Sequence, residues 1–434
     1  MTPSIRHWLR GDFARHAVAL GSGTALGQLV MVAVTPLLTR LYTPTDMGLF
    51  GLFANFLAVA SVAATLRLDF AVATTSNPDS SLRLLALSLL VCPVASVVLS
   101  AFLYVLIRED VFAYGLLPVW TVPLCAVALV ATGSFIALRY WHVGRRDFRV
   151  VGRALVAQGF ARAGASVLLG LPGTGWVGLA LGDVAGRAFG IRRLWREAGS
   201  ELARARRSGA LGRLREQFWH ARRFPLVVLP SSLVDALAAA LPLPVIAWLF
   251  DPAAAGQFAL VWRVAALPGG LVAASVGDVF HAHAARARDE GPGPSRRLLL
   301  DTMRMLALLA VVVYLPLCIV SPWVFGWIFG EPWREAGEML RLLGPLWVAA
   351  MVVSPVSRLP VVLGRPGLKF VFDLCFLVLP MAALVGASSR GLMTALLAYG
   401  LATAAAYVVF AVLLYAVAGR RAVQSPPPRT DQDP

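Results

Sequence analysis

Charged side chains are scarce in this sequence of 434 residues. They make up 14% of it, whereas 58% of the residues are apolar and the mean hydropathy is +0.73. Soluble globular domains carry about 25% charged residues, so a chain of this length with so few charges could not cover its own surface in water. The composition therefore excludes a soluble enzyme and predicts a membrane protein.

Lysine and acidic residues are also rare. The sequence contains one lysine and 38 arginines but only 15 Asp and 8 Glu, which gives a formal net charge of +16. A nucleic-acid-binding protein would gather its basic residues on a soluble face, but here they lie between apolar runs. We therefore expect no nucleic-acid partner, and we expect membrane lipids with anionic headgroups to contact these arginines.

Cysteine and histidine are too few and too scattered to indicate a metal site. The four cysteines lie singly inside apolar runs, at Cys92, Cys125, Cys318 and Cys375. His281 and His283 are two residues apart, which on a helix turns them to different faces. No nucleotide-binding loop is present either. The sequence therefore predicts no metal, no cofactor and no catalytic residue.

Long apolar runs are abundant instead. About twelve of them approach the roughly 20 residues that a helix needs to cross the hydrocarbon core. They lie near residues 17–38, 48–66, 84–107, 112–138, 151–171, 174–191, 224–249, 254–280, 298–320, 338–357, 367–387 and 391–417. The apolar piece at 323–329 is a candidate re-entrant segment before the tenth run. The fold predicted is an all-α polytopic membrane protein with about 12 transmembrane helices.

The distribution of the arginines predicts the orientation of these spans in the membrane. With the amino terminus inside, about 30 basic residues fall in inside segments and few fall outside, as the positive-inside rule requires. The outside residues are Arg40, Arg108, Arg334, Arg341 and Arg390. Both termini are therefore predicted to be cytoplasmic.

An internal repeat organises the chain. Residues 36–50 match residues 244–258 without a gap, at an offset of 208. The identical pairs are Pro36 and Pro244, Leu41 and Leu249, Pro44 and Pro252, Gly48 and Gly256, and Phe50 and Phe258. Each copy is predicted to join the first two helices of its half by a tight outer turn, in which Pro fixes φ and Gly permits the turn geometry.

Six spans separate the two copies, so both halves have the same orientation in the membrane, as in transporters built from parallel repeats. We predict an N-terminal six-helix lobe at 1–191 and a C-terminal six-helix lobe at 224–420. A basic cytoplasmic linker at 192–223 joins them, and the polar, proline-rich segment 421–434 is predicted to be a disordered tail.

Several of these segments resemble the polysaccharide-transport family of the multidrug/oligosaccharidyl-lipid/polysaccharide exporter superfamily. In the first half they are Gly21–Gln28 (GSGTALGQ), Thr39–Phe50 (TRLYTPTDMGLF) and Thr65–Ala71 (TLRLDFA). In the second half they are Phe224–Ser232 (FPLVVLPSS), Ala255–Phe258 (AGQF) and Ser275–Phe280 (SVGDVF). The resemblance covers roughly residues 15 to 420. The acidic and basic pair that the family often has after its second helix is matched by Arg67 and Asp69.

The resemblance implies a flippase of the bacterial inner membrane, with two six-helix lobes around a central cavity that opens to alternate faces. Its substrate would be a polyprenyl-diphosphate-linked oligosaccharide used for surface polysaccharide biosynthesis. Glycan polymerases and glycosyltransferases are further candidate partners. Sugar specificity varies widely in the family, so no sugar-contacting residue is carried over to this chain.

Six ionisable residues lie at mid-depth in the predicted spans, where a charge is costly unless it meets a partner or a water-filled cavity. They are Arg162, Asp183, Arg187, Asp235, Arg263 and Asp373. Arg162 and Arg263 are predicted to bind the diphosphate, because a guanidinium stays charged and grips phosphate oxygens with a planar fork of donors. Arg67, nearer the cytoplasmic end, is predicted to contact the substrate at the gate.

Each of these roles has a plainer alternative. Arg67 could snorkel to the interface, and Arg162 and Arg263 could pair with carboxylates only to hold the lobes together. Asp183 and Arg187, four residues apart, are predicted to form a structural ion pair. Asp235 and Asp373 then remain as candidate ion-coupling residues, because a partly buried carboxyl can exchange a proton between facing states.

Two other functions fit parts of the sequence. An ion-coupled exporter of drugs or metabolites from the same superfamily would predict more acids than arginines at mid-depth. A membrane polysaccharide polymerase or glycosyltransferase would need paired carboxylates or a large outer loop for catalysis. Every predicted outer loop is short, and Glu109 and Asp110 form the single acidic pair outside. The sequence therefore favours a transporter over an enzyme.

Overall fold

The computed structural model describes residues 12–75, 77–209, 211–290, 292–357, 359–362 and 366–418. All regular elements within these ranges are helices. They form two compact units, the first within Met1–Leu260 and Phe325–Ala336 and the second within Val261–Val324 and Gly337–Pro434. The predicted tail at 421–434 lies outside the described residues.

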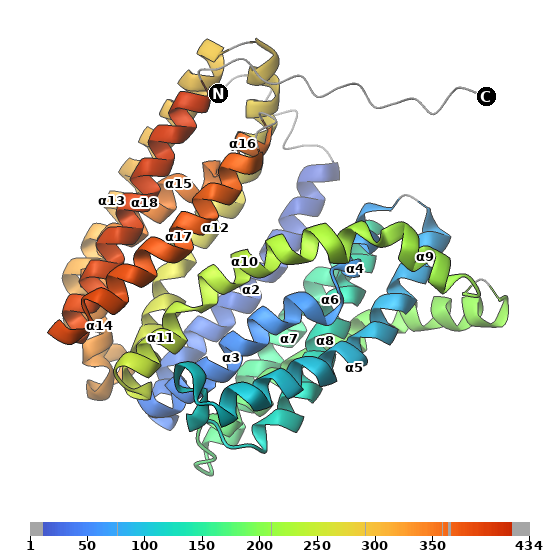
Figure 1. The fold of residues 1–434 in the computed structure, drawn as a ribbon, viewed down its shortest axis with the longest axis horizontal. Coiled ribbons are helices and arrows are strands. Elements are labelled where there is room, and N and C mark those ends of the chain that lie inside the picture. Colours follow the sequence, from blue (N-terminus) through green and yellow to red (C-terminus); the bar gives the residue numbers. More distant parts are fainter. Residues whose placement is uncertain are drawn as a thin grey trace. The chain divides into compact units, whose positions relative to one another are not determined.

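The first half of the chain is a series of helices joined by short turns (Figure 1). They are α2 (Asp12–Leu41), α3 (Pro44–Ala64), α4 (Leu68–Thr74), α5 (Pro78–Arg108), η1 (Val111–Leu116), α6 (Thr121–Gly144), α7 (Phe148–Gly170), α8 (Trp176–Arg207) and α9 (Leu214–Ala221). Within the first unit α7 packs between α2 and α8, and α6 packs against α5 and α8.

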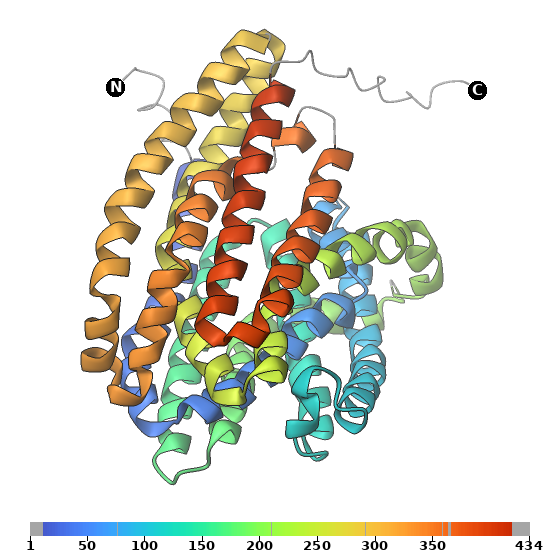
Figure 2. The same ribbon diagram turned by 60° about the vertical axis from the view of Figure 1, so that its left-hand side comes forward.

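The second half of the chain is also a series of helices, but more of these helices are interrupted. Its elements are η2 (Phe224–Val228), α10 (Leu229–Ala240), α11 (Pro242–Leu249), α12 (Pro252–Glu290), α13 (Pro292–Phe329), η3 (Glu331–Trp333), α14 (Arg334–Leu342), α15 (Gly344–Val353), η4 (Ser354–Val356), α16 (Leu359–Val362), α17 (Pro366–Gly386), η5 (Ser388–Arg390) and α18 (Leu392–Ala418). In the second unit α18 packs beside both α15 and α17 (Figure 2).

Each of the twelve predicted spans overlaps one helix or a series of consecutive helices. Among the described residues, six helices are long and apolar enough to cross a membrane, or eight when each pair of bent helices is taken as one span. One bend of 41° separates Leu214–Ala221 from Phe224–Ala240, and one of 55° separates Glu331–Leu342 from Gly344–Val356. The chain is therefore an all-α polytopic membrane protein, as its composition predicts.

Two details of the predicted spans are wrong. The piece at 323–329 is no re-entrant segment, because α13 runs on through Pro322 and ends at Phe329. The fourth span begins later than residue 112, since a 3-10 turn with left-handed backbone at Phe112 and Ala113 interrupts the apolar run before α6 starts at Thr121. An apolar run does not reveal where its backbone turns.

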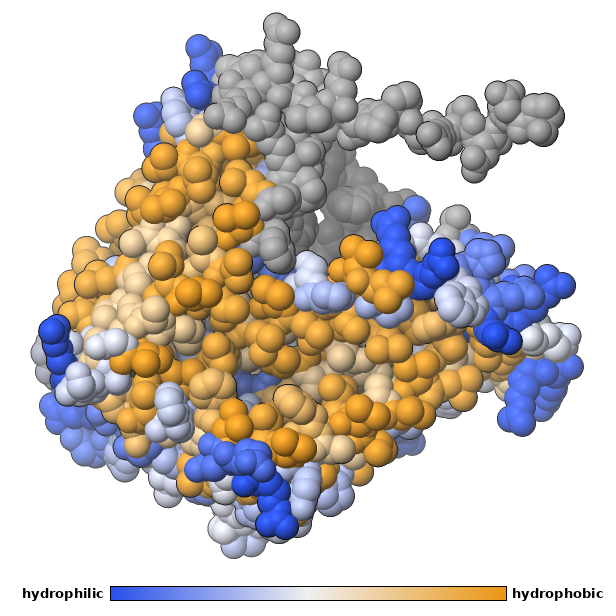
Figure 3. Space-filling view, in the orientation of Figure 1, coloured by the Kyte–Doolittle hydropathy of each residue, from blue (hydrophilic) through white to orange (hydrophobic). Residues whose placement is uncertain are grey.

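Helix α5 shows the burial pattern that a lipid solvent produces. Its serines at 88, 96 and 100 are buried, whereas Leu90 and Val94 are more than 60% exposed. A soluble helix would reverse this order, because water would solvate the serines and exclude the aliphatic side chains. Hydrophobic residues cover the sides of α3, α5 and α10, and hydrophilic ones gather at the ends of these helices (Figure 3). The apolar flank of α5 therefore faces the membrane.

The two copies of the repeat adopt the same local structure. In the first copy Thr43 Oγ1 accepts a hydrogen bond from the Asp46 backbone N–H at 3.1 Å and caps α3. In the second copy Asp251, the residue that aligns with Thr43, accepts one from the Ala254 N–H at 2.7 Å. Each capped helix then begins with the proline that the repeat shares, where the missing N–H is no loss. The predicted tight turns are thus present in both halves. The predicted role of the glycines is wrong, because Gly48 and Gly256 lie inside α3 and α12 and have no left-handed backbone.

The basic segment 192–223 is largely helical, although it has no long apolar run. Helix α8 continues to Arg207, and α9 follows after a short turn. On this extension Leu194, Ala198 and Ala205 are buried, while its arginines, for example Arg192 and Arg196, are exposed. The extension is therefore an amphipathic helix with an arginine-rich outer face. The lobe boundaries at 191 and 224 stay a prediction.

Candidate functional site

Three of the predicted mid-depth charges form one cluster in the first unit. Asp183 on α8 lies between Arg162 on α7 and Arg187 one helical turn further along α8. The Arg162 Nε is 3.1 Å from one oxygen of Asp183, and an Arg187 Nη contacts the other oxygen. The Asp183 side chain is 4% exposed, and those of Arg162 and Arg187 are 29% and 17% exposed. The predicted Asp183–Arg187 ion pair is present, and Arg162 joins it.

Glycines on α8 allow this cluster to form. They recur every four residues, at Gly178, Gly182, Gly186 and Gly190, and produce a smooth face along which α7 approaches closely. A methyl group on Gly186 would lie 2.7 Å from the Cβ of Arg162, so a larger residue would push the two helices apart. The four-residue glycine period is visible in the sequence and indicates a close helix contact on this face of α8, but it does not indicate that α7 makes the contact.

The cluster carries one positive charge more than it can neutralise. Two guanidiniums share one carboxylate, and a pair of buried charges is stable only when its partners are close and hydrogen-bonded. The Nε of Arg162 makes the contact with Asp183. The two Nη nitrogens carry four of the five N–H donors of the guanidinium and are the atoms that could turn to the phosphate oxygens of an anionic ligand.

Arg67 lies in the turn that follows α3, and Asp69 lies in the first turn of α4. Leu66 and Arg67 have φ values of 52° and 59°, in the left-handed region that non-glycine residues rarely occupy. The guanidinium of Arg67 lies 4.8 Å from the centroid of the Phe70 ring. The turn thus places Arg67 outside the apolar helix, at the end of the span where the sequence predicts a gate-level contact.

Asp69 is a buried carboxylate that the site prediction did not include. It is 1% exposed, and one of its oxygens accepts a hydrogen bond from Thr65 Oγ1 at 2.5 Å. Its other oxygen is buried without a hydrogen-bond partner. Burial raises the pKa of this carboxyl above its ordinary value, although the Thr65 hydrogen bond and the charge of Arg67 oppose the shift. The TLRLDF segment therefore contains both a strained backbone and a buried, poorly solvated carboxyl group.

Arg263 and Asp373 belong to the second unit. Arg263 is half-buried on α12, next to Trp262, whose ring packs edge-on against Trp347 at 4.8 Å. Asp373 is half-buried on α17, close enough to Tyr407 of α18 for an electrostatic interaction. Because Arg162 belongs to the other unit, the substrate-binding set stays a prediction.

Asp235 is exposed on α10, a helix of apolar residues. Among the described residues no hydrogen-bond or ion-pair partner contacts it. An unpaired carboxylate on a membrane helix requires water or a cation beside it. The helix that carries Asp235 begins with a π-helical turn at Phe224–Val228, which contains Pro225 and continues directly into α10. This combination is compatible with the predicted role in ion coupling.

An apolar groove of about 870 Å³ lies within the second unit between α13, α15 and α18. Aliphatic side chains such as Leu315, Val348 and Val408 line it. Arg341 also contributes to the lining. Such a groove suits a hydrocarbon chain whose charged headgroup remains near an arginine.

Comparison with known proteins identifies the family. Residues 37–338 match the model of a family described as polysaccharide biosynthesis protein. The chain belongs to this family. The match includes residues 37–50 of the first copy of the repeat, the whole second copy, and all three residues of the Arg162–Asp183–Arg187 cluster. It confirms the resemblance to the polysaccharide-transport family that the sequence motifs indicate. Among curated proteins, none matches the chain in sequence.

Solved structures show the same fold for this polysaccharide biosynthesis protein. A lipid II flippase, MurJ, in an inward closed conformation has a TM-score of 0.63 at 12% identity, with 92% of this chain and 86% of that chain covered. An inward-facing multidrug resistance transporter of the MATE family and MOP superfamily has a TM-score of 0.59 at 15% identity, with 91% and 93% covered. A MOP superfamily transporter from Pyrococcus furiosus, described as having a binding pocket of reverse polarity, has a TM-score of 0.56 at 15% identity, with 94% and 96% covered.

Proposed function

We propose that this protein is a flippase that moves polyprenyl-diphosphate-linked oligosaccharides from the cytoplasmic to the outer leaflet of the bacterial inner membrane by alternating access, for surface polysaccharide biosynthesis. The observation that carries the proposal is the Arg162–Asp183–Arg187 cluster, with its surplus positive charge inside the spans of a polysaccharide biosynthesis protein. In this proposal the protein is a transporter and catalyses no chemical step.

The charge balance explains why arginines are needed. A lipid diphosphate carries about two negative charges, and hydrocarbon cannot solvate them, so a polar route must supply cations along the way. Arg162 can turn its Nη nitrogens to the diphosphate while its Nε stays on Asp183. Arg67 would meet the headgroup at the cytoplasmic end, and Arg263 would bind it from the second unit. A guanidinium held by a carboxylate is already oriented, which lowers the entropy lost on binding.

The rest of the substrate is a long hydrocarbon chain. The groove between α13, α15 and α18 offers an apolar surface for such a chain, and burial of each CH₂ group contributes roughly 0.8 kcal/mol. Glycan polymerases and glycosyltransferases that make and use the lipid-linked glycan are the partner proteins this function implies. The excess of arginine in the predicted inside loops supports a cytoplasmic location for both termini.

Binding of the substrate can be tested by native mass spectrometry of the full-length protein in mild detergent, with polyprenyl diphosphate added as the probe. The wild type is expected to retain the lipid diphosphate. Arg263→Ala and Arg162→Gln are expected to lose it, because each removes a cation from the route. Arg204→Gln, an exposed arginine at the end of α8, is the control and should retain it.

In cells that make the cognate glycan, Arg263→Ala should abolish export at an unchanged protein level. Export at the wild-type rate would remove Arg263 from the binding site. If the wild type retains organic cations or small metabolites and ignores polyprenyl diphosphate, the protein is the ion-coupled exporter that the sequence also permits. Turnover of a sugar donor by the purified protein would instead identify a polymerase or glycosyltransferase.

A further inference from the structure

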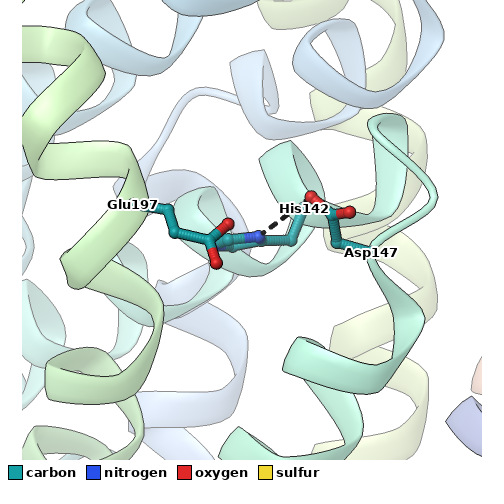
Figure 4. A group of neighbouring side chains, drawn as sticks. All are labelled: His142, Asp147 and Glu197. Atoms are coloured by element: carbon teal, nitrogen blue, oxygen red, sulfur yellow. Dashed lines mark ion pairs between the residues drawn. The ribbon is translucent and has the colours of Figure 1, made fainter.

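Three side chains from neighbouring helices converge at one end of the first unit, away from the charged cluster described above. His142 lies in the last turn of α6, Asp147 immediately precedes α7, and Glu197 lies on the extension of α8. One ring nitrogen of His142 and one oxygen of each carboxylate all lie within 4.8 Å of one another. Figure 4 shows the His142 ring between the two carboxylates.

The hydrogen bond made by His142 fixes which of its ring nitrogens carries the proton. The side chain is fully buried, and its Nε2 lies 3.1 Å from the backbone oxygen of Leu194. A carbonyl oxygen can only accept, so Nε2 must donate and the neutral ring presents a lone pair at Nδ1. That Nδ1 is buried without a hydrogen-bond partner and faces an Asp147 oxygen at 3.6 Å. A lone pair and a carboxylate repel each other unless a cation lies between them.

The two carboxylates are available to such a cation. Asp147 occupies the N-cap position of α7, yet its side chain makes no capping hydrogen bond. The Glu197 carboxylate is exposed and makes no ion pair or hydrogen bond with the described residues, although Arg193 and Arg196 lie on the same helix. Within the described part of the chain, neither carboxylate is therefore engaged in a hydrogen bond that a bound cation would have to break.

The neighbouring arginine is already engaged elsewhere. Arg145 holds both oxygens of Glu201 at 2.6 and 2.7 Å and lies over the Trp141 ring. Its Nε also forms a looser ion pair with Asp147, at 3.7 Å, which is beyond hydrogen-bond distance. Because Arg145 and Glu201 neutralise each other, a neutral imidazole and two carboxylates remain, with a combined charge of −2. This charge matches a divalent cation.

We propose that His142, Asp147 and Glu197 bind a divalent transition-metal cation, for which Zn²⁺ is the appropriate probe. One imidazole nitrogen with two carboxylate oxygens is a donor set for such ions, whereas Mg²⁺ and Ca²⁺ prefer oxygen alone. Zinc bonds of about 2.0–2.2 Å in a tetrahedral site place ligand atoms roughly 3.4 Å apart, close to the 3.6 Å between His142 and Asp147. Water would fill the fourth position.

The bound cation joins the ends of α6, α7 and α8. Helix α8 also carries Asp183 and Arg187, so the metal would fix the helix that holds the charged cluster. The sequence could not indicate this site, because its ligands are 5 and 50 residues apart along the chain. Only the packing of α8 against α6 brings Glu197 to the histidine.

The test is zinc binding by the full-length protein in detergent, freed of its affinity tag and stripped with a chelator. Equilibrium dialysis should find a zinc ion that the wild type binds and Glu197→Gln does not, with a Kd raised at least about tenfold in the variant. Zinc should raise the Tm of the wild type and leave that of Glu197→Gln unchanged. Magnesium should raise neither.

Glu197 is exposed, so its replacement by Gln should not disturb folding, and an unchanged Tm without metal verifies this. Glu216→Gln, an exposed carboxylate on α9, is the matched control and should bind zinc like the wild type. Asp147→Asn should weaken binding as Glu197→Gln does. Equal zinc binding by the wild type and Glu197→Gln, or no binding by the wild type, would overturn the proposal and leave a proton as the bridge between His142 and Asp147.

Discussion

Gly48 and Gly256, the glycines that align in the repeat, touch each other's helix in a reciprocal manner. A Cβ built on Gly48 would overlap the carbonyl oxygen of Pro252, and a Cβ on Gly256 would overlap the carbonyl oxygen of Pro44. The first turns of α3 and α12 therefore cross with their backbones in contact. The contact is symmetric, because each glycine meets the proline that aligns with the proline of its own helix. A sequence repeat has become a symmetric packing contact.

Substitution of either glycine should weaken this crossing. Gly48→Ala and Gly256→Ala insert a methyl group where a carbonyl already lies, and overpacking of this kind typically destabilises by about 1–3 kcal/mol. Both variants should lower the Tm of the detergent-solubilised protein. Gly164→Ala is the control, because nothing lies within 4 Å of its added Cβ. An alanine there should raise helix stability slightly. A Tm unchanged by both Gly48→Ala and Gly256→Ala would show that the crossing is loose.

The charged cluster should respond differently to the loss of its aspartate, Asp183, and to the loss of Arg162. Asp183→Asn leaves two partly buried guanidiniums without a carboxylate, and removing one partner of a buried pair costs roughly 3–5 kcal/mol. Arg162→Gln keeps the Asp183–Arg187 pair and should fold normally. We expect a strongly lowered Tm for Asp183→Asn, and a near-native Tm with lost lipid binding for Arg162→Gln. Retained binding in Arg162→Gln would make this arginine structural.

Stability should depend on pH through Asp69. Burial raises the pKa of this carboxyl in the folded protein, so the folded state binds the proton more tightly than the unfolded state. Its contribution to stability is then fully present below the unfolded pKa of about 4 and is lost as the pH rises through the folded-state value. Thermal unfolding of the wild type should show this loss, and Asp69→Asn should not. A wild-type pH profile identical to that of Asp69→Asn would contradict the assignment.

Asp235 provides a test of coupling. Its exposed, unpaired carboxylate on α10 can accept a proton or a cation and lose it again. Asp235→Asn should remove the dependence of transport on pH or on sodium in proteoliposomes, while the lipid still binds. Asp301→Asn changes a solvent-exposed carboxylate on α13 and serves as the control. A dependence that persists in Asp235→Asn leaves Asp373 as the remaining candidate.

Much of the fold followed from the sequence because lipid imposes a simple rule. Backbone groups in hydrocarbon must pair internally, so each long apolar run must be helical, and each of the twelve runs is helical over most of its length, although several are interrupted. The repeat located the two capped turns, since a Thr or Asp before Pro has the same local geometry wherever it occurs. Helix formation and capping depend on residues that are neighbours in the chain, so they can be predicted from the sequence.

Pairings between helices were decided by the tertiary structure alone. The four-residue spacing predicted the Asp183–Arg187 pair, but only the close approach of α7 along the glycines of α8 brought Arg162 to the same carboxylate. The sequence does not show that packing buries Asp69. His142 and Glu197 are 55 residues apart along the chain, and only the fold brings them together. Hydropathy specifies that a helix lies in the membrane, because transfer free energy is a sum over single residues. Which faces of two helices meet depends on how their surfaces fit, and that fit exists only once the chain has folded.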